Sequence, residues 1–161
     1  ISECLVGSEM CIRDSIIAGF PGETDYDFEE SLRLIKDAEF CKVHPFRYSK
    51  REGTAAAEMR DQIRSEVKNR RMALLTQAGE AASKEFFKKS IGDVRTVLFE
   101  EQEFIDEGNG RDECSCRGET YITGYTDNYI KVYVPGGREN LNSFKEVKLL
   151  EIYKDGMKGE I

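Results

Sequence analysis

The sequence predicts an α/β protein whose second part is a small all-β barrel. In the first half, apolar residues recur at helical spacing between two short apolar runs. This strand–helix–strand order implies a parallel sheet with a right-handed crossover. After Ile91 and Gly92 the apolar residues alternate in short runs between polar loops, as in a small barrel. With 39% hydrophobic and 34% charged residues, the 161-residue chain has the composition of a globular protein.

The first strand is expected at Ile16–Ala18, because this apolar run ends in a turn-forming Gly-Phe-Pro-Gly sequence. Thr24 is suited to cap the helix that follows, and Asp27 completes a weaker form of the capping box. The other elements expected before the barrel are a helix over about 25–38, a strand at 41–48, a loop at 50–57, and one or two long helices over 58–88 with Gly79 as a candidate break.

The barrel is expected to begin after a domain boundary near Ser90. Its expected strands are 94–100, 120–125, 129–134 and 145–154, with a polar, mostly acidic insertion at 101–118. The second and third strands form a hairpin around Thr126-Asp127-Asn128. The apolar phase switches between Leu149 and Leu150, which predicts a β-bulge in the last strand.

The first fifteen residues differ from the rest. The run Cys4–Ser15 resembles the in-frame translation of a transposon-library sequencing adapter, and it is too short and too polar for a signal peptide. We therefore expect residues 1–15 to be a non-native segment that packs against nothing; the alternative is an ordinary N-terminal segment.

Charge and cysteine usage exclude several classes of protein. The net charge of −7 disfavours indiscriminate nucleic-acid binding, so any RNA contact requires a local patch. No apolar run is long enough to span a membrane. The cysteines, which form no C-x-x-C pair and so disfavour a zinc ribbon or a disulfide scaffold, are Cys4, Cys11, Cys41, Cys114 and Cys116. Cys114 and Cys116 are either two thiols in a polar loop, the interpretation favoured by their missing partners, or part of a redox or metal site.

Two motifs follow the first two strands. The segment Ile17–Thr24 places glycines between a strand and a helix, where a ligand can approach the backbone and free N–H groups of the helix N-terminus; many such glycines serve turn geometry alone. The segment His44–Thr54 lies at the carboxyl end of the next parallel strand, the edge at which α/β sheets bind ligands. His44, the only histidine, is either a general base or, more commonly for a strand histidine, a packed side chain.

Together these segments resemble the radical S-adenosylmethionine methylthiotransferases, which carry G-F-P-G-E-T after the fifth strand of a partial barrel and an aromatic-Y-S-x-R-x-G-T segment after the sixth. The resemblance covers Ile16 to Ile161. It implies that residues 16–90 are the end of a radical-SAM partial (β/α) barrel with its connecting helices. The residues that it implies for S-adenosylmethionine binding are Gly19, Phe20, Pro21, Gly22, Glu23, Phe46, Tyr48, Arg51 and Thr54. Two positions depart from the family: Ser15, where aspartate is usual, and Ala55, where proline is frequent.

The last part, residues 91–161, resembles the TRAM domain, a small OB-like RNA-binding β-barrel. The motif that carries this resemblance is Gly124–Val134, which is most similar to the subgroup acting on threonylcarbamoyl-adenosine beside the tRNA anticodon. Strict alternation directs Ile130, Val132 and Val134 to the core and the intervening residues outward. The residues expected to bind RNA are Tyr125, Asn128, Tyr129, Lys131 and Tyr133; the alternative is that the tyrosines only cover the barrel surface.

The family's chemistry requires two [4Fe–4S] clusters, one held by a C-x-x-x-C-x-x-C triad and one by three further cysteines, and this sequence contains neither set. The resemblance therefore implies a fragment of a cytoplasmic enzyme that inserts a methylthio group at C2 of threonylcarbamoyl-adenosine. The cluster ligands would lie in a missing N-terminal half, and the fragment alone would be inactive, with no catalytic residue of its own. The alternatives are an isopentenyl-adenosine tRNA methylthiotransferase fragment and a non-catalytic RNA-binding module.

Overall fold

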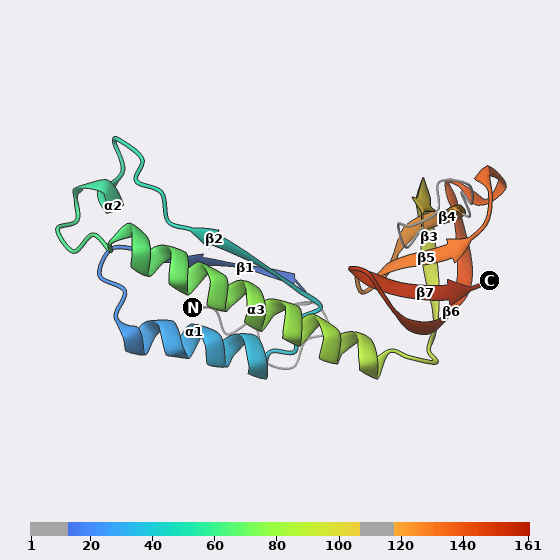
Figure 1. Cartoon of the computed structure of the whole chain (residues 1–161), viewed down its shortest axis with the longest axis horizontal. Coiled ribbons are helices and arrows are strands. Elements are labelled where there is room, and N and C mark those ends of the chain that lie inside the picture. Colours follow the sequence, from blue (N-terminus) through green and yellow to red (C-terminus); the bar gives the residue numbers. More distant parts are fainter. Residues whose placement is uncertain (1–12, 107–117) are drawn as a thin grey trace, which may run out of the picture. The chain divides into compact units, whose positions relative to one another are not determined.

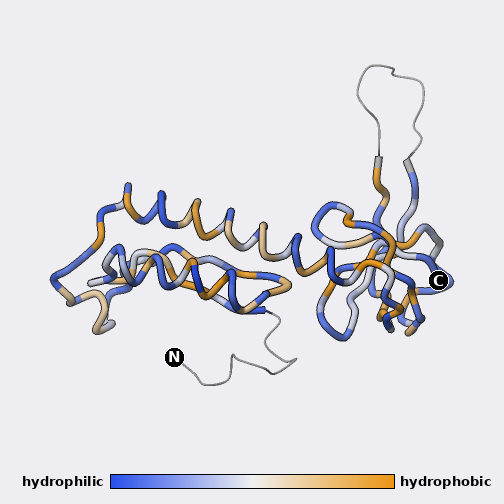
Figure 2. The backbone as a smooth tube through the Cα atoms, turned by 90° about the horizontal axis from the view of Figure 1, so that it is seen from below, coloured by the Kyte–Doolittle hydropathy of each residue, from blue (hydrophilic) through white to orange (hydrophobic). Residues whose placement is uncertain are grey.

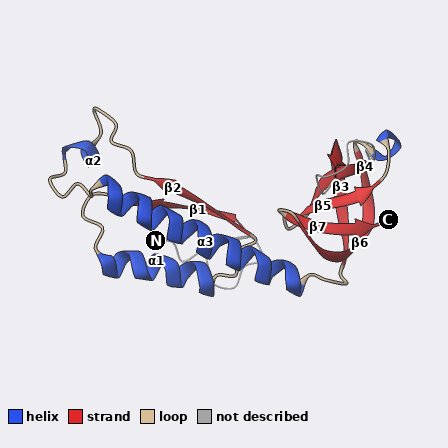
Figure 3. Ribbon diagram, viewed as in Figure 1, coloured by secondary structure: helices blue, strands red, loops and turns tan. Residues whose placement is uncertain are grey.

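The computed structural model describes residues 13–106 and 118–161, and the chain divides between Phe86 and Phe87 into two compact units (Figure 1). The elements of the first half are β1 (Arg13–Ala18), α1 (Asp25–Asp37), β2 (Lys42–Arg47), α2 (Ala55–Glu58) and α3 (Ser65–Lys89). Those of the second half are β3 (Val94–Asp106), β4 (Gly118–Thr126), β5 (Lys131–Pro135), the 3-10 helix η1 (Arg138–Asn140), β6 (Ser143–Tyr153) and β7 (Gly156–Glu160) (Figure 3). The predicted mixed α/β class is confirmed.

In the first unit, β1, α1 and β2 form the expected βαβ unit, with β1 and β2 parallel and Ile17 opposite Phe46. The predicted capping box is present at the start of α1. The Thr24 hydroxyl oxygen accepts a hydrogen bond from the Asp27 amide (3.2 Å), and the Asp27 carboxylate accepts one from the Thr24 amide (2.9 Å). This local sequence signal therefore fixes where α1 begins and how the chain leaves β1.

Helices α1 and α3 contribute to one core with one face of the two-stranded sheet. The buried residues of this core are Ala18, Phe28, Ile35, Phe40, Val43 and Leu75. Helix α3 is continuous, and hydrophilic and hydrophobic turns alternate along it (Figure 2). Gly79 is therefore not the break that its residue type indicated. A Cβ there would lie 3.1 Å from the Val43 Cβ, so glycine serves close approach of α3 to β2.

Three boundaries in this unit differ from expectation. Arg13, Asp14 and Ser15 belong to β1 and pair with residues 42–44, so the expectation that nothing before Ile16 packs is wrong for these three residues. Backbone pairing extends a strand with little regard to side-chain type, which explains the difference. Residues 1–12 lie outside the described part. Ala55–Glu58 forms α2 where a loop was expected, and the long helix begins at Ser65 rather than Glu58.

The second unit is a closed five-stranded barrel with the order β3-β4-β5-β7-β6. All neighbouring strands are antiparallel except β5 and β7, which are parallel. The barrel strands carry fully buried side chains that include Val97, Phe99, Ile122, Val132, Val147, Leu149 and Met157. The register of β6 on β7 shifts between Leu149 and Glu151, so the predicted bulge is confirmed.

Two features of the barrel were not predicted. Strand β3 continues to Asp106 into the expected insertion, after a register shift between Phe99 and Glu101. The remainder of that insertion, 107–117, lies outside the described residues. Strand β7 was missed because its sequence contains two glycines, a composition that weakens any strand signal. A Cβ at Gly156 would lie 2.1 Å from the Lys131 carbonyl oxygen, so the glycine is required by a neighbouring backbone. Within the described ranges, no helix combines the length and the apolar character needed to cross a membrane.

Candidate ligand-binding edge and barrel face

The turn after β1 is built on two glycines in the left-handed region, Gly19 (φ 75°) and Gly22 (φ 84°). A Cβ at Gly19 would also lie 2.4 Å from the Cγ of Lys68, so the stem of Lys68 packs directly on this glycine. The Gly22 amide donates to the Asp61 carbonyl (2.9 Å) and the Glu23 amide to the Phe20 carbonyl (3.0 Å). Both glycines are thus required by the geometry of the turn.

Four amides of this turn are not the free N–H groups that the sequence suggested. The amides of Gly19, Gly22, Glu23 and Thr24 all donate to acceptors within the chain. Two of those acceptors are carboxylates, those of Glu23 and Asp27. The helix N-terminus is already capped by negative charge, so this edge is not suited to cradle a phosphate.

A buried arginine, which sequence reasoning missed, holds this arrangement. Arg71 of α3 is 5% exposed and contacts the Glu23 carboxylate through Nη1 and the Asp25 carboxylate through Nη2 (2.7 Å). Burial acts to lower the pKa of Arg71, but the hydrogen bonds to Asp25 and Glu23 outweigh it and raise that pKa above its ordinary value. No local motif marks Arg71, because its partners lie 46 and 48 residues earlier.

The second motif meets the first at this edge of the sheet. The Tyr48 amide donates to the Ala18 carbonyl (2.9 Å), and the rings of Tyr48 and Phe20 meet edge to face with centroids 5.4 Å apart. The Lys68 ammonium lies 4.8 Å from the centre of the Tyr48 ring. The Tyr48 hydroxyl is buried and has no hydrogen-bond partner among the described residues. A buried orphan hydroxyl of this kind fits a site in which a ligand or water supplies the partner.

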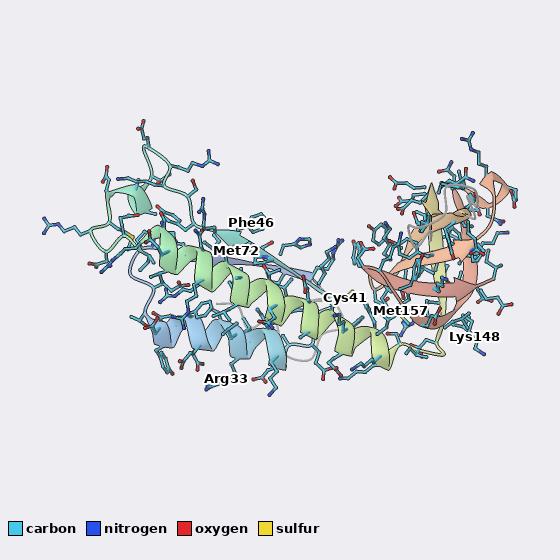
Figure 4. All side chains as sticks on the ribbon, viewed as in Figure 1. Arg33, Cys41, Phe46, Met72, Lys148 and Met157 are labelled. Carbon is cyan, nitrogen blue, oxygen red and sulfur yellow. The ribbon has the colours of Figure 1, made fainter. Side chains whose placement is uncertain are left out.

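Within the described ranges, the sheet face opposite the core carries exposed side chains. Side chains alternate along a strand, so Ser15 and Ile17 of β1 share this face with His44 and Phe46 of β2. Ile17 is 51% exposed and Phe46 55%. The Phe46 side chain is labelled on β2 in Figure 4. His44 lies on this face, half-buried and opposite Ser15, rather than in the core between sheet and helices.

The remaining predicted ligand residues lie in two settings. Pro21 is buried within the turn. Arg51 and Thr54 are exposed and form a turn of their own, in which the Thr54 hydroxyl donates to the Arg51 carbonyl (2.7 Å). The structure thus gathers Gly19, Phe20 and Tyr48 at one edge. The ligand role of all nine residues stays a prediction.

On the barrel, Tyr125 and Tyr129 are the exposed tyrosines of the β4–β5 hairpin, 39% and 53% exposed. Tyr129 precedes β5 with φ of 60°, while Tyr125 pairs directly with Lys131 across the two strands. The Asn128 side-chain oxygen accepts a hydrogen bond from the Thr126 hydroxyl, which itself accepts one from the Ile130 amide (2.9 Å). Asn128 therefore holds the turn with its oxygen.

Two residues of the expected outward row are not available as predicted. Tyr133 points outward but is only 2% exposed, because its ring packs against Tyr121 and Tyr153 in a small second core with Ile105. Its hydroxyl donates to the Asp155 carboxylate (2.5 Å). The Lys131 ammonium pairs with Glu103 (2.7 Å). Alternation alone missed this outer core, because it depends on aromatic residues from neighbouring strands.

Tyr133 gives a pH-dependent prediction. Burial, aided by the hydrogen bond to Asp155, raises the pKa of Tyr133 from 10.0 to about 12. The folded barrel therefore keeps a proton that the unfolded chain releases, so this contribution to stability is complete below pH 10 and is lost as pH rises towards about 12. We expect the free energy of unfolding to fall less steeply above pH 10 in Tyr133→Phe than in the unchanged protein, measured by urea unfolding. Tyr125→Phe is the control, and equal slopes in the unchanged protein and Tyr133→Phe would contradict the prediction.

The described residues provide no set of cysteine ligands for an iron–sulfur cluster. Cys41 is the one cysteine among them; it is 2% exposed, and burial raises the pKa of its thiol to about 11. Cluster ligation requires a set of thiolates, which this buried thiol does not supply. The other four cysteines, Cys4, Cys11, Cys114 and Cys116, lie outside the described residues.

The chain thus consists of a parallel βαβ unit with a candidate ligand-binding edge and a small barrel with exposed aromatic residues. No protein-family model matches the chain. It is 34% identical over 142 residues to the threonylcarbamoyladenosine tRNA methylthiotransferase MtaB of Bacillus subtilis, an alignment that covers 88% of this chain and 29% of that protein. It is 36% identical over 157 residues to a tRNA-2-methylthio-N(6)-dimethylallyladenosine synthase of Campylobacter jejuni, which covers 95% of this chain and 33% of the relative.

These homologues, which match most of the chain, are tRNA-methylthiolating enzymes by name. The chain spans about a third of the length of the curated relatives it matches. The alignment with the Campylobacter jejuni relative covers 95% of this chain, which is a larger share than residues 16–161 make up. It therefore includes residues before Ile16.

Proposed function

We propose that this chain forms part of the S-adenosylmethionine site and the tRNA-binding barrel of a tRNA methylthiotransferase. In this proposal the whole enzyme acts in the cytoplasm on threonylcarbamoyl-adenosine beside the anticodon, and its two [4Fe–4S] clusters are held by residues outside this chain. The observation that carries the proposal is the joining of the two motifs at one sheet edge by the Tyr48–Ala18 hydrogen bond. That edge carries an unsatisfied buried hydroxyl and borders an open apolar face.

The residues at this edge fit S-adenosylmethionine better than a phosphorylated ligand. The carboxylates of the turn would repel a phosphate, whereas S-adenosylmethionine has no phosphate and bears a sulfonium and an ammonium group. Phe46 and Ile17 offer exposed apolar surface on which an adenine ring can stack, and the Tyr48 hydroxyl offers a polar partner. When bound, S-adenosylmethionine supplies the reactive group of the methylthiolation. This chain's residues bind and orient it.

The barrel supports the RNA-binding half of the proposal. A closed five-stranded barrel with one parallel pair is the arrangement of OB-type barrels, which bind oligonucleotides on their strand 2–3 face. Here that face is β4–β5, where Tyr125 and Tyr129 are exposed for stacking on bases. Lys131 is neutralised by Glu103, so stacking rather than charge should dominate.

The test is a pair of chimeric enzymes. In one, the part of the Bacillus subtilis relative that matches this chain is replaced by residues 13–161; in the other, the matching part of the Campylobacter jejuni relative is replaced. Each is expressed in a strain that lacks the matching activity, and nucleosides from total tRNA are analysed by mass spectrometry. We expect methylthiolated threonylcarbamoyl-adenosine from the first chimera. Product from the second alone would support the dimethylallyl-adenosine alternative, and no product from either soluble chimera would count against the enzyme assignment.

The chain alone is expected to be inactive. After reconstitution with iron and sulfide under reducing conditions, the purified chain should form no 5′-deoxyadenosine from S-adenosylmethionine, because its cysteines do not include the triad that the cleavage requires. The positive control is a full-length relative treated in the same way. Formation of 5′-deoxyadenosine by the chain, dependent on added iron, would refute this expectation.

We expect the exposed tyrosines of the barrel to contribute to the affinity for RNA. We expect Tyr125→Ala and Tyr129→Ala each to weaken binding of a tRNA anticodon stem-loop by about 1–3 kcal/mol, the value of one lost base stack. Fluorescence anisotropy measures the affinity, and circular dichroism verifies the fold. Tyr26→Ala, at a 69% exposed tyrosine on α1, is the matched control. Unchanged affinity in both folded barrel variants would place the RNA site elsewhere.

A further inference from the structure

Among the charged residues of the described part of the chain, Arg71 is the one that is buried, with 5% exposure. Its Nη1 donates both to the Glu23 carboxylate and to the Glu23 backbone carbonyl (3.1 Å), so one nitrogen of the guanidinium binds two acceptors of the same residue. The guanidinium also lies 5.3 Å from the centre of the Phe28 ring, which fixes its plane from the α1 side. These hydrogen bonds connect α3 to the turn after β1.

The Glu23 carboxylate, which binds Arg71, also accepts a second hydrogen bond. Glu23 Oε2, the oxygen that contacts Arg71, also accepts the hydrogen bond from the Gly19 amide (2.8 Å). Gly19 is the first residue after β1 and has a left-handed backbone. The orientation of its peptide group is therefore set by where Arg71 holds the Glu23 side chain.

The two acidic partners of Arg71 are unequal. The Glu23 side chain is 10% exposed, whereas that of Asp25 is 94% exposed. An ion pair with a solvent-exposed carboxylate contributes little, while a buried carboxylate that loses its cation is strongly disfavoured and tends to move towards water. Loss of Arg71 should therefore release Glu23 from Gly19, and loss of Asp25 should not.

We propose that Arg71 is a positioning residue of the ligand-binding edge, which fixes the Gly19 peptide through Glu23 and so shapes the backbone that S-adenosylmethionine contacts. This inference rests on the proposed function for the identity of the ligand. Arg71 touches no ligand in this role; it acts through Glu23. The shape of the guanidinium matters as well as its charge, because a lysine side chain ends one bond short of the Nη1 position and lacks the planar group that lies beside the Phe28 ring.

The test compares Arg71→Met, Arg71→Lys and the matched control Asp25→Asn in the full chain. Titration calorimetry measures S-adenosylmethionine affinity, and the Gly19 amide resonance in a ¹H–¹⁵N spectrum reports the carboxylate hydrogen bond. We expect Arg71→Met to weaken binding by about tenfold or more and to shift the Gly19 resonance upfield. Arg71→Lys, which keeps the charge, should retain the melting temperature yet shift the resonance and weaken binding, while Asp25→Asn should match the unchanged protein.

The two readouts separate this inference from the proposed function. If the unchanged chain binds no S-adenosylmethionine, the ligand assignment fails, but the Gly19 resonance still decides the positioning role. A Gly19 resonance that stays in place in a folded Arg71→Met variant overturns the proposal. So does an Arg71→Lys variant that equals the unchanged protein in both readouts, because Arg71 would then supply only charge balance.

Discussion

Replacing Gly124 with alanine is expected to destabilise the barrel strongly. Gly124 lies in β4 opposite Phe99, next to the register shift in β3. A Cβ there would lie 2.0 Å from the Leu98 carbonyl oxygen and 2.8 Å from the Phe99 Cα. These are backbone atoms of a paired strand, so no side-chain rotation relieves the clash. We expect a loss of about 3 kcal/mol or more, and a melting temperature lower by more than about 10 °C for a unit of this size.

The matched control is Gly136→Ala in the same barrel. A Cβ at Gly136 meets only the Ile122 side chain, at 3.7 Å, which is ordinary van der Waals contact. We therefore expect this variant to melt within a few degrees of the unchanged protein, a change of about 0.5 kcal/mol or less. Thermal unfolding followed by circular dichroism tests both. Equal melting temperatures for the two variants would show that the β3–β4 spacing adapts, contrary to the packing described.

The second large effect is expected from Leu75→Ala in α3. Leu75 is fully buried among Ala18, Phe28 and Val43 in the core of the first unit. Removing its side chain leaves a cavity between the helices and the sheet, so we expect a loss of about 2–5 kcal/mol. Amide hydrogen exchange of β1 and β2 measures the effect within this unit.

The neighbouring residue supplies the control. Leu74 is the same residue type on the same helix but is 37% exposed. Leu74→Ala should cost clearly less than Leu75→Ala, because 37% of Leu74 already contacts water and its removal leaves no enclosed cavity. Similar protection in both variants would mean that α3 does not depend on the burial of Leu75.

Local sequence signals predicted the parts of the fold that depend on neighbouring residues. Thr24 and Asp27 marked the start of α1 because their hydrogen bonds close within one turn. The apolar phase switch at Leu149 marked the bulge of β6, since strand alternation is itself a local property. The strand-helix-strand order likewise predicted the parallel pairing of β1 and β2.

The features that were missed depend on distant partners. Arg71 has the appearance of an ordinary helix arginine until the fold brings Glu23 to it. Tyr133 alternates like a surface residue, and only the neighbouring Tyr121 and Tyr153 bury it. The order of the two motifs along the chain predicted that both would lie at one sheet edge, where Phe20 and Tyr48 are in contact. The acceptors of the turn amides could not be predicted, because no rule of sequence spacing specifies those hydrogen bonds.

The position of β7 has a consequence for how the barrel is made. This strand pairs with β5 on one side and β6 on the other, and it is the last strand along the described chain. Until the ribosome has released it, β5 and β6 each expose a row of unpaired backbone groups, the kind of edge that recruits strands from other chains. The barrel therefore cannot close until β7 is available to pair with β5 and β6, and a nascent chain stalled before Gly156 is a candidate for chaperone capture or aggregation. Slow codons upstream of Gly156 would prolong that exposure, whereas rapid synthesis of β7 would shorten it.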